Sequence, residues 1–131
     1  MITTDQQSYN TISALAKFNR ESGFFSTPNI DRIVKSGTAF NLTYCSNPVS
    51  VPSRFSLYTG LYGGQFSIRE NLCRGAKAEE VRPVLAENGM GHVFAAAGYE
   101  TVYAGKVHLP YAGINSDSNL LHRSHTDFSS I

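Results

Sequence analysis

The sequence is poor in cysteine, in net charge and in long apolar runs. Its two cysteines, Cys45 and Cys73, are too few for a disulfide scaffold and lack the paired spacing of a zinc site. Eleven Lys and Arg against ten Asp and Glu leave a net charge of +1, which gives no long-range field for nucleic acid or an anionic membrane. No apolar run approaches the roughly 20 residues of a membrane span. We therefore expect a soluble protein that binds any anion locally.

The N-terminal residues also lack a targeting signal, because no basic region followed by an apolar stretch occurs there. The length of 131 residues is that of one ordinary domain. Hydrophobic residues make up 41% of the chain and charged residues 16%, which excludes a disordered or fibrous protein. A single globular domain is therefore expected.

Helix and strand signals alternate along the chain. Helices are predicted over residues 28–36, 50–59 and 91–97, with glycines after them as stop signals. In the first of these, Ile30, Ile33 and Val34 fall on one apolar face. Strands are predicted over residues 2–4, 38–44 and 99–104, where apolar or β-branched residues recur. The pattern indicates an α/β chain, and the polar stretch after Pro110 has no predicted regular structure.

Asp5 follows the predicted first strand, which we expect to be buried. A carboxylate at the carboxyl end of a strand is well placed to bind a hard metal ion, and the amide oxygens of Gln6 and Gln7 can join it. The same aspartate also suits a turn or a helix cap. Both interpretations stay open on the residues alone.

Ser50 and Arg54 are one helical turn apart at the start of the predicted helix 50–59. The spacing brings a nucleophile and a cation to one face. We expect the free N–H groups and the partial positive charge of the helix N-terminus to complete a site for a tetrahedral anion such as sulfate or phosphate. Simple helix capping by the serine is the alternative.

Lys106 and His108 come at the end of the last predicted strand. Because residues two apart in a strand share one side, both can face an anion. Lysine is a point-charge partner for sulfate or phosphate, and histidine can donate a hydrogen bond or move a proton near neutral pH. A solvated strand end is the alternative interpretation.

Taken in chain order, residues 4–7, 50–60 and 98–109 resemble the N-terminal part of a type I sulfatase. Ser50 opens the (Cys/Ser)-x-Pro-x-Arg signature that carries the family's nucleophile. The resemblance covers residues 2–110 and implies the alkaline-phosphatase-like α/β fold, a mixed and mainly parallel sheet flanked by helices. We expect residues 1–110 to be the N-terminal part of the catalytic domain and residues 111–131 to be a polar tail without an assignment.

The resemblance implies a sulfuric ester hydrolase in which Ser50 becomes formylglycine. A serine at this position is typical of bacterial members matured by a radical S-adenosylmethionine enzyme. In such enzymes one hydroxyl of the hydrated aldehyde attacks sulfur, the alcohol leaves, and the other hydroxyl helps to expel sulfate. Arg54 then supports the modified residue, Lys106 steadies it together with the sulfate, and His108 hydrogen-bonds the diol.

The resemblance also implies a bound Ca²⁺, with Mg²⁺ as the other candidate, held by Asp5, Gln6 and the modified Ser50. Gln6 stands where many sulfatases have a second aspartate, so the ion is less fully compensated. The remaining ligands of the family, and a further His and Lys, come from much further along the chain. The chain also begins inside the first strand, so a truncated sulfatase that is inactive alone is expected. Full-length relatives of this kind are commonly periplasmic or secreted.

Two other functions remain open at this point. The expected substrate is a sulfated carbohydrate or a small sulfate ester, but a phosphoester or phosphonate would suit the same cations. Alternatively, the chain is a non-catalytic remnant that forms homo-oligomers, because an incomplete sheet exposes an unpaired edge and apolar faces.

Overall fold

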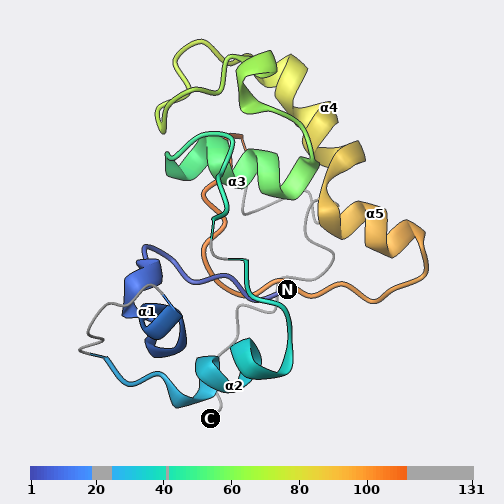
Figure 1. Cartoon of the computed structure of the whole chain (residues 1–131). Coiled ribbons are helices and arrows are strands. Elements are labelled where there is room, and N and C mark those ends of the chain that lie inside the picture. The colour runs from blue at the N-terminus through green and yellow to red at the C-terminus, as the bar shows by residue number, and fades with distance from the viewer. Residues whose placement is uncertain (19–24, 41, 112–131) are drawn as a thin grey trace, which may run out of the picture. The chain divides into compact units, whose positions relative to one another are not determined.

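The computed structural model describes residues 1–18, 25–40 and 42–111, which form short helices joined by irregular chain (Figure 1). The chain divides into two compact units, Met1–Tyr44 and Cys45–Ile131, and each is considered by itself. In the part of the chain described, no helix has both the length and the apolar character needed to cross a bilayer.

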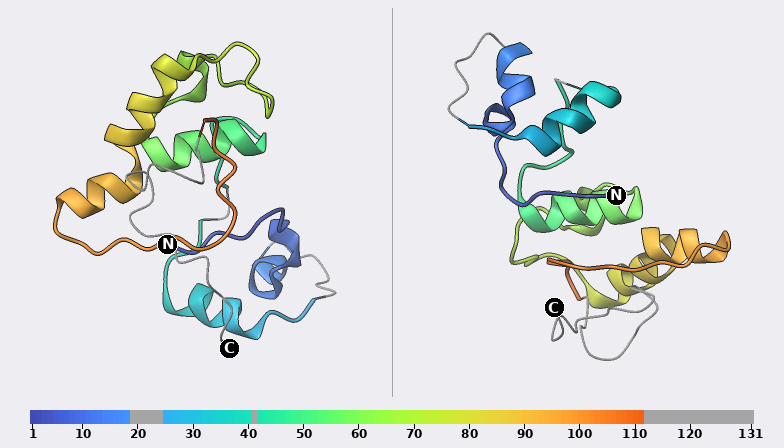
Figure 2. Two further views of the ribbon diagram at one scale, coloured as in Figure 1. Left: turned by 180° about the vertical axis from the view of Figure 1, so that it is seen from behind. Right: turned by 90° about the horizontal axis from the view of Figure 1, so that it is seen from below.

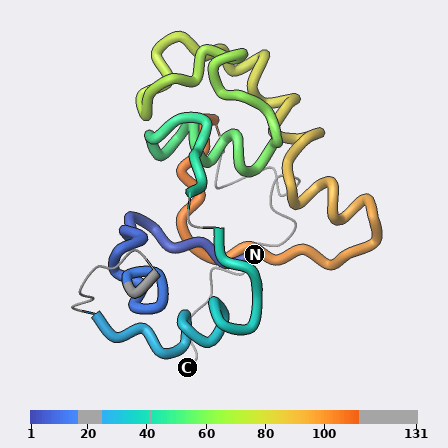
Figure 3. Tube along the Cα trace, viewed as in Figure 1, coloured from blue at the N-terminus to red at the C-terminus, as the bar shows by residue number. Residues whose placement is uncertain are grey.

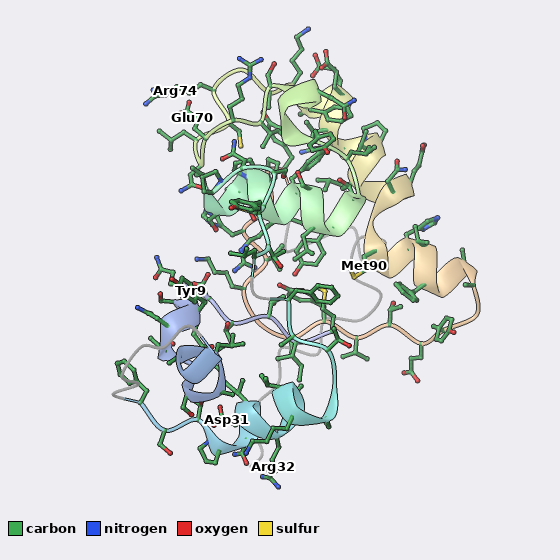
Figure 4. All side chains as sticks on the ribbon, viewed as in Figure 1. Tyr9, Asp31, Arg32, Glu70, Arg74 and Met90 are labelled. Atoms are coloured by element: carbon green, nitrogen blue, oxygen red, sulfur yellow. The ribbon has the colours of Figure 1, made fainter. Side chains whose placement is uncertain are left out.

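The first unit contains the 3-10 helix η1 (Tyr9–Thr11) and the helices α1 (Ser13–Phe18) and α2 (Pro28–Ser36). Asp31, labelled in Figure 4, lies on α2 and joins it to the start of α1. Its carboxylate accepts hydrogen bonds from the Ser13 hydroxyl at 2.6 Å, the Ala14 N–H at 3.0 Å and the Thr27 hydroxyl at 2.9 Å. The side chain therefore satisfies an N–H at the start of α1 that has no partner within that helix.

The second unit contains α3 (Ser50–Thr59), the 3-10 helix η2 (Gly63–Phe66), α4 (Ala78–Asn88) and α5 (Met90–Ala96). Figure 2 shows from two further sides that α4 leads directly into α5. The core of the second unit consists of side chains from α3, α4 and the loop between them: Val51, Phe55, Ile68, Cys73, Val81 and Leu85. The ring of Phe66 lies 5.5 Å from that of Phe55 and covers the core from η2.

Two glycines set the end of α3 and the turn that follows. Gly60 has a φ of +72° and ends the helix in the left-handed conformation that glycine adopts without strain. At Gly63 a side chain would meet the carbonyl oxygen of Ile68 at 2.7 Å. Only glycine allows this close approach of η2 to the chain at Ile68.

The structure confirms the predicted helices 28–36 and 50–59 as α2 and α3, and places the third at Met90–Ala96, one residue earlier than expected. The elements η1, α1, η2 and α4 were not predicted. The apolar face expected on the first helix is largely uncovered, because Ile33 is 66% exposed and α2 has no buried residue.

The predicted sheet is not confirmed, since no β-strand occurs within residues 1–18, 25–40 and 42–111. The described parts of segments 2–4, 38–44 and 99–104 are irregular, and Ile2, expected in a buried strand, is 90% exposed. Leu42 and Tyr44 are similarly open. A strand is held by ladder bonds to neighbouring strands, and apolar alternation in one segment cannot supply those neighbours. Apart from Tyr111, the predicted tail 111–131 lies outside the described residues.

Truncating a buried and an exposed leucine of the second unit should have very different effects on the free energy of unfolding. Leu85 is fully buried on α4, whereas Leu72 is 68% exposed. Leu85→Ala should lower the free energy of unfolding by about 2–5 kcal/mol, because it removes apolar contacts and leaves a cavity. Leu72→Ala should change it by less than about 0.5 kcal/mol. Urea denaturation of both variants measures this, and equal losses would contradict the core described here.

The hydrogen bonds of Asp31 that connect α1 and α2 should weaken in acid. Hydrogen bonding from Ser13 is the main cause that lowers the pKa of Asp31 below its ordinary value, with Thr27, Ala14 and Lys35 adding to it. A lowered folded-state pKa means that the stabilisation is present above the unfolded-state pKa of 3.8 and is lost as the pH falls through the lower folded-state value. The protection factor of the Ala14 amide, which corrects its exchange rate for the slower intrinsic exchange in acid, should therefore fall below about pH 4. Asp31→Asn should exchange faster at neutral pH and lose that pH dependence.

Candidate active site

Ser50 is the first residue of α3 and lies within reach of two nitrogen-containing side chains. Its Oγ is 2.8 Å from Nδ1 of His108 and accepts a longer hydrogen bond of 3.4 Å from Nε of Arg54. The side chain of Ser50 is only partly buried. A hydroxyl, an imidazole and a guanidinium thus converge at a position that solvent can reach.

Arg54 connects the helix to the segment that carries His108. It lies one turn after Ser50 on α3, and its Nη1 donates to the carbonyl oxygen of Lys106 at 2.9 Å. The guanidinium therefore bonds two parts of the chain through different nitrogens, which its planar fork of donors allows.

The segment from residue 103 to residue 111 is an irregular strap across the second unit (Figure 3, orange). Gly105 and His108 both have positive φ values, +116° and +46°. Residues 103–111 form no strand, so strand alternation does not place Lys106 and His108 on one side as expected. Instead, Lys106 meets Arg54 through its backbone carbonyl, while His108 meets Ser50 through its ring.

The far end of the strap is attached to the core. Leu109 packs against the core cluster, and Pro110 is buried. The hydroxyl of Tyr111 donates to the carbonyl oxygen of Ala76 at 2.8 Å. His108 is therefore bounded by an anchored stretch on its C-terminal side.

The N-terminus of α3 offers fewer free N–H donors than the sequence led us to expect. The Val51 N–H donates to Oδ1 of Asn71 at 3.0 Å, Pro52 has no N–H, and the Ser53 N–H donates to the carbonyl of Val49. Asn71 was missed because a lone loop asparagine has no spacing signal. An anion at Ser50 must therefore be bound mainly by side chains and by the helix dipole.

Two tyrosines missed by the sequence analysis lie beside Arg54 and Lys106. Tyr58, four residues after Arg54, donates to the hydroxyl of Tyr103 at 2.8 Å, and Tyr103 donates to the carbonyl of Lys106. Their rings meet edge to face at 5.8 Å. Burial and the hydrogen bond with Tyr103 raise the pKa of Tyr58 well above its ordinary value. The four-residue spacing of Ser50, Arg54 and Tyr58 is the sequence signal that could have indicated Tyr58.

Asp5 and Gln6 belong to the first unit, so the structure does not test their predicted place beside Ser50. Their carboxylate and amide oxygens are the donors that Ca²⁺ and Mg²⁺ accept, but a complete calcium site needs about 6–8 oxygens. No group of three or more His, Cys, Asp or Glu suited to a metal ion occurs among the residues that the structure covers. The two residues fit part of a metal site, and their role stays a prediction.

Comparison with known proteins identifies the family. The family model for sulfatases matches residues 1–126. The chain is 33% identical over 108 residues to the uncharacterized sulfatase YidJ of Escherichia coli K12. The matched region covers 82% of this chain and 19% of that protein. No solved structure matches significantly.

Two relatives from Bacteroides thetaiotaomicron are similar over a shorter range. The chain is 36% identical over 81 residues to a delta 4,5-hexuronate-2-O-sulfatase, covering 60% of this chain and 16% of the relative. It is 37% identical over 84 residues to an N-acetylgalactosamine-6-O-sulfatase, and this match covers 64% of this chain and 16% of the relative. The chain thus spans less than a fifth of the length of these relatives. Because the family model matches nearly the whole sequence, the chain belongs to the sulfatase family.

Proposed function

We propose that this chain provides the nucleophile and its nearest partners in a sulfate ester hydrolase, with Ser50 as the residue oxidised to formylglycine. The observation that supports this most directly is the convergence of His108 Nδ1 and Arg54 Nε on Ser50 Oγ, in a member of the sulfatase family. Since the aligned part is less than a fifth of these relatives, the activity of the whole protein is part of the proposal.

The residues around Ser50 divide the work by their chemistry. His108, with Nδ1 on the Ser50 oxygen, can accept or return a proton at that atom. Arg54 stays charged and opposes the negative charge of a sulfate held there. The ammonium group of Lys106, from the same strap, would provide a second cation for the sulfate oxygens. Formylglycine, once formed, supplies a hydrated aldehyde whose hydroxyl is the nucleophile.

A divalent metal is part of the same proposal. Asp5 and Gln6 would contribute oxygen ligands to Ca²⁺ or Mg²⁺, with the modified Ser50 as a further ligand. The metal would supply positive charge that lowers the pKa of a bound hydroxyl. Other ligands must complete the coordination, because these donors are too few.

The substrate we propose is a sulfated carbohydrate, since relatives bear the names of hexuronate and N-acetylgalactosamine sulfatases. We further propose a radical S-adenosylmethionine enzyme as the maturation partner and a periplasmic or secreted location. In the complete fold, segments 38–44 and 99–104 would join the family's alkaline-phosphatase-like sheet, which would cover exposed apolar side chains such as Tyr44 and Val102.

Mass spectrometry of protein made in its native host tests the identity of the nucleophile. Trypsin should release residues 36–54 as one peptide containing Ser50. We expect this peptide to have lost two hydrogens at Ser50, because oxidation of the CH₂OH group to an aldehyde removes them. Ser53→Ala is the matched control and should keep the modification, whereas Ser50→Ala should abolish it. Unmodified serine, in a host that matures its other sulfatases, would contradict the proposal.

Inorganic sulfate tests the anion site separately from the modification. Titration should move the ring resonances of His108, and Arg54→Gln should weaken the apparent affinity by about tenfold, because a charge-assisted hydrogen bond is lost. Arg82→Gln, an exposed change on α4, should leave it unaltered. Equal effects of both variants would exclude Arg54 as a sulfate ligand. Phosphate binding much tighter than sulfate binding would favour a phosphoester hydrolase instead.

A further inference from the structure

One backbone carbonyl holds the strap to α3. The oxygen of Lys106 accepts hydrogen bonds from the hydroxyl of Tyr103 and from Nη1 of Arg54, which uses both of its lone pairs. His108 lies two residues after Lys106, and its ring forms a hydrogen bond with Ser50. The position of the imidazole therefore depends on how firmly this carbonyl is held.

The hydroxyl of Tyr103 is itself held in place by Tyr58. Tyr58 donates to it at 2.8 Å, so the Tyr103 oxygen is directed to donate its own proton onward to Lys106. Edge-to-face packing at 5.8 Å fixes the two rings. The raised pKa of Tyr58 keeps its hydroxyl protonated and able to donate across the physiological pH range.

The backbone around His108 needs such support. The strap has no strand ladder, and the φ of +46° at His108 lies in a region that non-glycine residues seldom occupy. Conformations of this kind persist only where surrounding contacts impose them. Tyr111 and Leu109 hold one side of His108, and the Lys106 carbonyl holds the other.

We propose that Tyr103, aligned by Tyr58, is a positioning residue that clamps the Lys106 carbonyl against Arg54 and so keeps the imidazole of His108 on the Ser50 oxygen. Neither tyrosine is shown touching Ser50. Tyr103 acts through the strap, and Tyr58 acts through Tyr103 and through its hydrogen bond with Arg54. The catalytic meaning of this clamp rests on the proposed function, but the clamp itself can be measured without any activity.

The test compares three tyrosine-to-phenylalanine variants of the full chain. Tyr103→Phe removes the donor to Lys106 and the acceptor for Tyr58, whereas Tyr58→Phe removes the donor to Tyr103 and the hydrogen bond between Tyr58 and Arg54. Tyr99→Phe is the matched control, because Tyr99 lies in the same irregular stretch and is 64% exposed. Ser50→Ala gives the reference signal for a His108 ring that has lost its partner.

Two readouts follow the strap directly. In ¹⁵N NMR spectra, the His108 Nδ1 resonance of Tyr103→Phe should shift in the direction that Ser50→Ala produces, with a smaller shift for Tyr58→Phe. Tryptic cleavage after Lys106, measured against cleavage after the exposed Arg74 in the same digest, should accelerate about tenfold in Tyr103→Phe and about threefold in Tyr58→Phe. Tyr99→Phe should change neither readout.

The possible outcomes separate this inference from the proposed function. An unchanged His108 resonance in Tyr103→Phe overturns the clamp, even if Ser50 is found as formylglycine. A shifted resonance with normal thermal stability supports the clamp, even if Ser50 proves to be unmodified. If Tyr103→Phe unfolds, Tyr58→Phe decides: a small shift of the His108 resonance in the direction of Ser50→Ala supports the clamp, and an unchanged resonance overturns it.

Discussion

The burial of one side of α3 determines where Ser50, Arg54 and Tyr58 point. Val51 and Phe55 are one turn apart and pack against Val81 and Leu85 of α4. Since a helix is rigid, fixing that side also fixes the stripe next to it. Ser50, Arg54 and Tyr58 lie on this stripe at intervals of four residues. Each forms a hydrogen bond with a residue of the strap: Ser50 with His108, Arg54 with Lys106 and Tyr58 with Tyr103. The apolar core thus acts on the chemistry through the orientation of a single helix.

The two units are held together by different forces. In the second unit, apolar packing around Phe55 dominates, and among its described residues only Thr59 is a buried polar residue. In the first unit, Ala16 is the buried hydrophobic residue among those described, and the hydrogen bonds of Asp31 to Ser13 and Ala14 join the helices. The link between α1 and α2 in the first unit therefore depends on the ionisation of one carboxylate, whereas the core of the second unit depends mainly on apolar contacts.

Sequence reasoning succeeded where the signals are local. Proline and glycine positions define α2 and α3, and helical spacing relates Arg54 to Ser50. It missed α4, whose interior Pro83 conceals the helix. The predicted strands are not confirmed in the described residues, because a strand needs partners that local alternation does not reveal. The contacts of Asn71 with Val51 and of Tyr103 with Tyr58 join distant parts of the chain, so no pattern within one segment could indicate them.

The cap that Asn71 places on α3 has a consequence for how this site can change over evolutionary time. Because Asn71 occupies the Val51 N–H and proline removes the next one, the anion site proposed at Ser50 would depend more on side chains than on the backbone. Backbone donors are shared by every sequence that adopts the fold, but side chains can be exchanged one at a time. A lineage carrying this arrangement can alter its preference among oxyanions by single substitutions while the helix and its core remain intact.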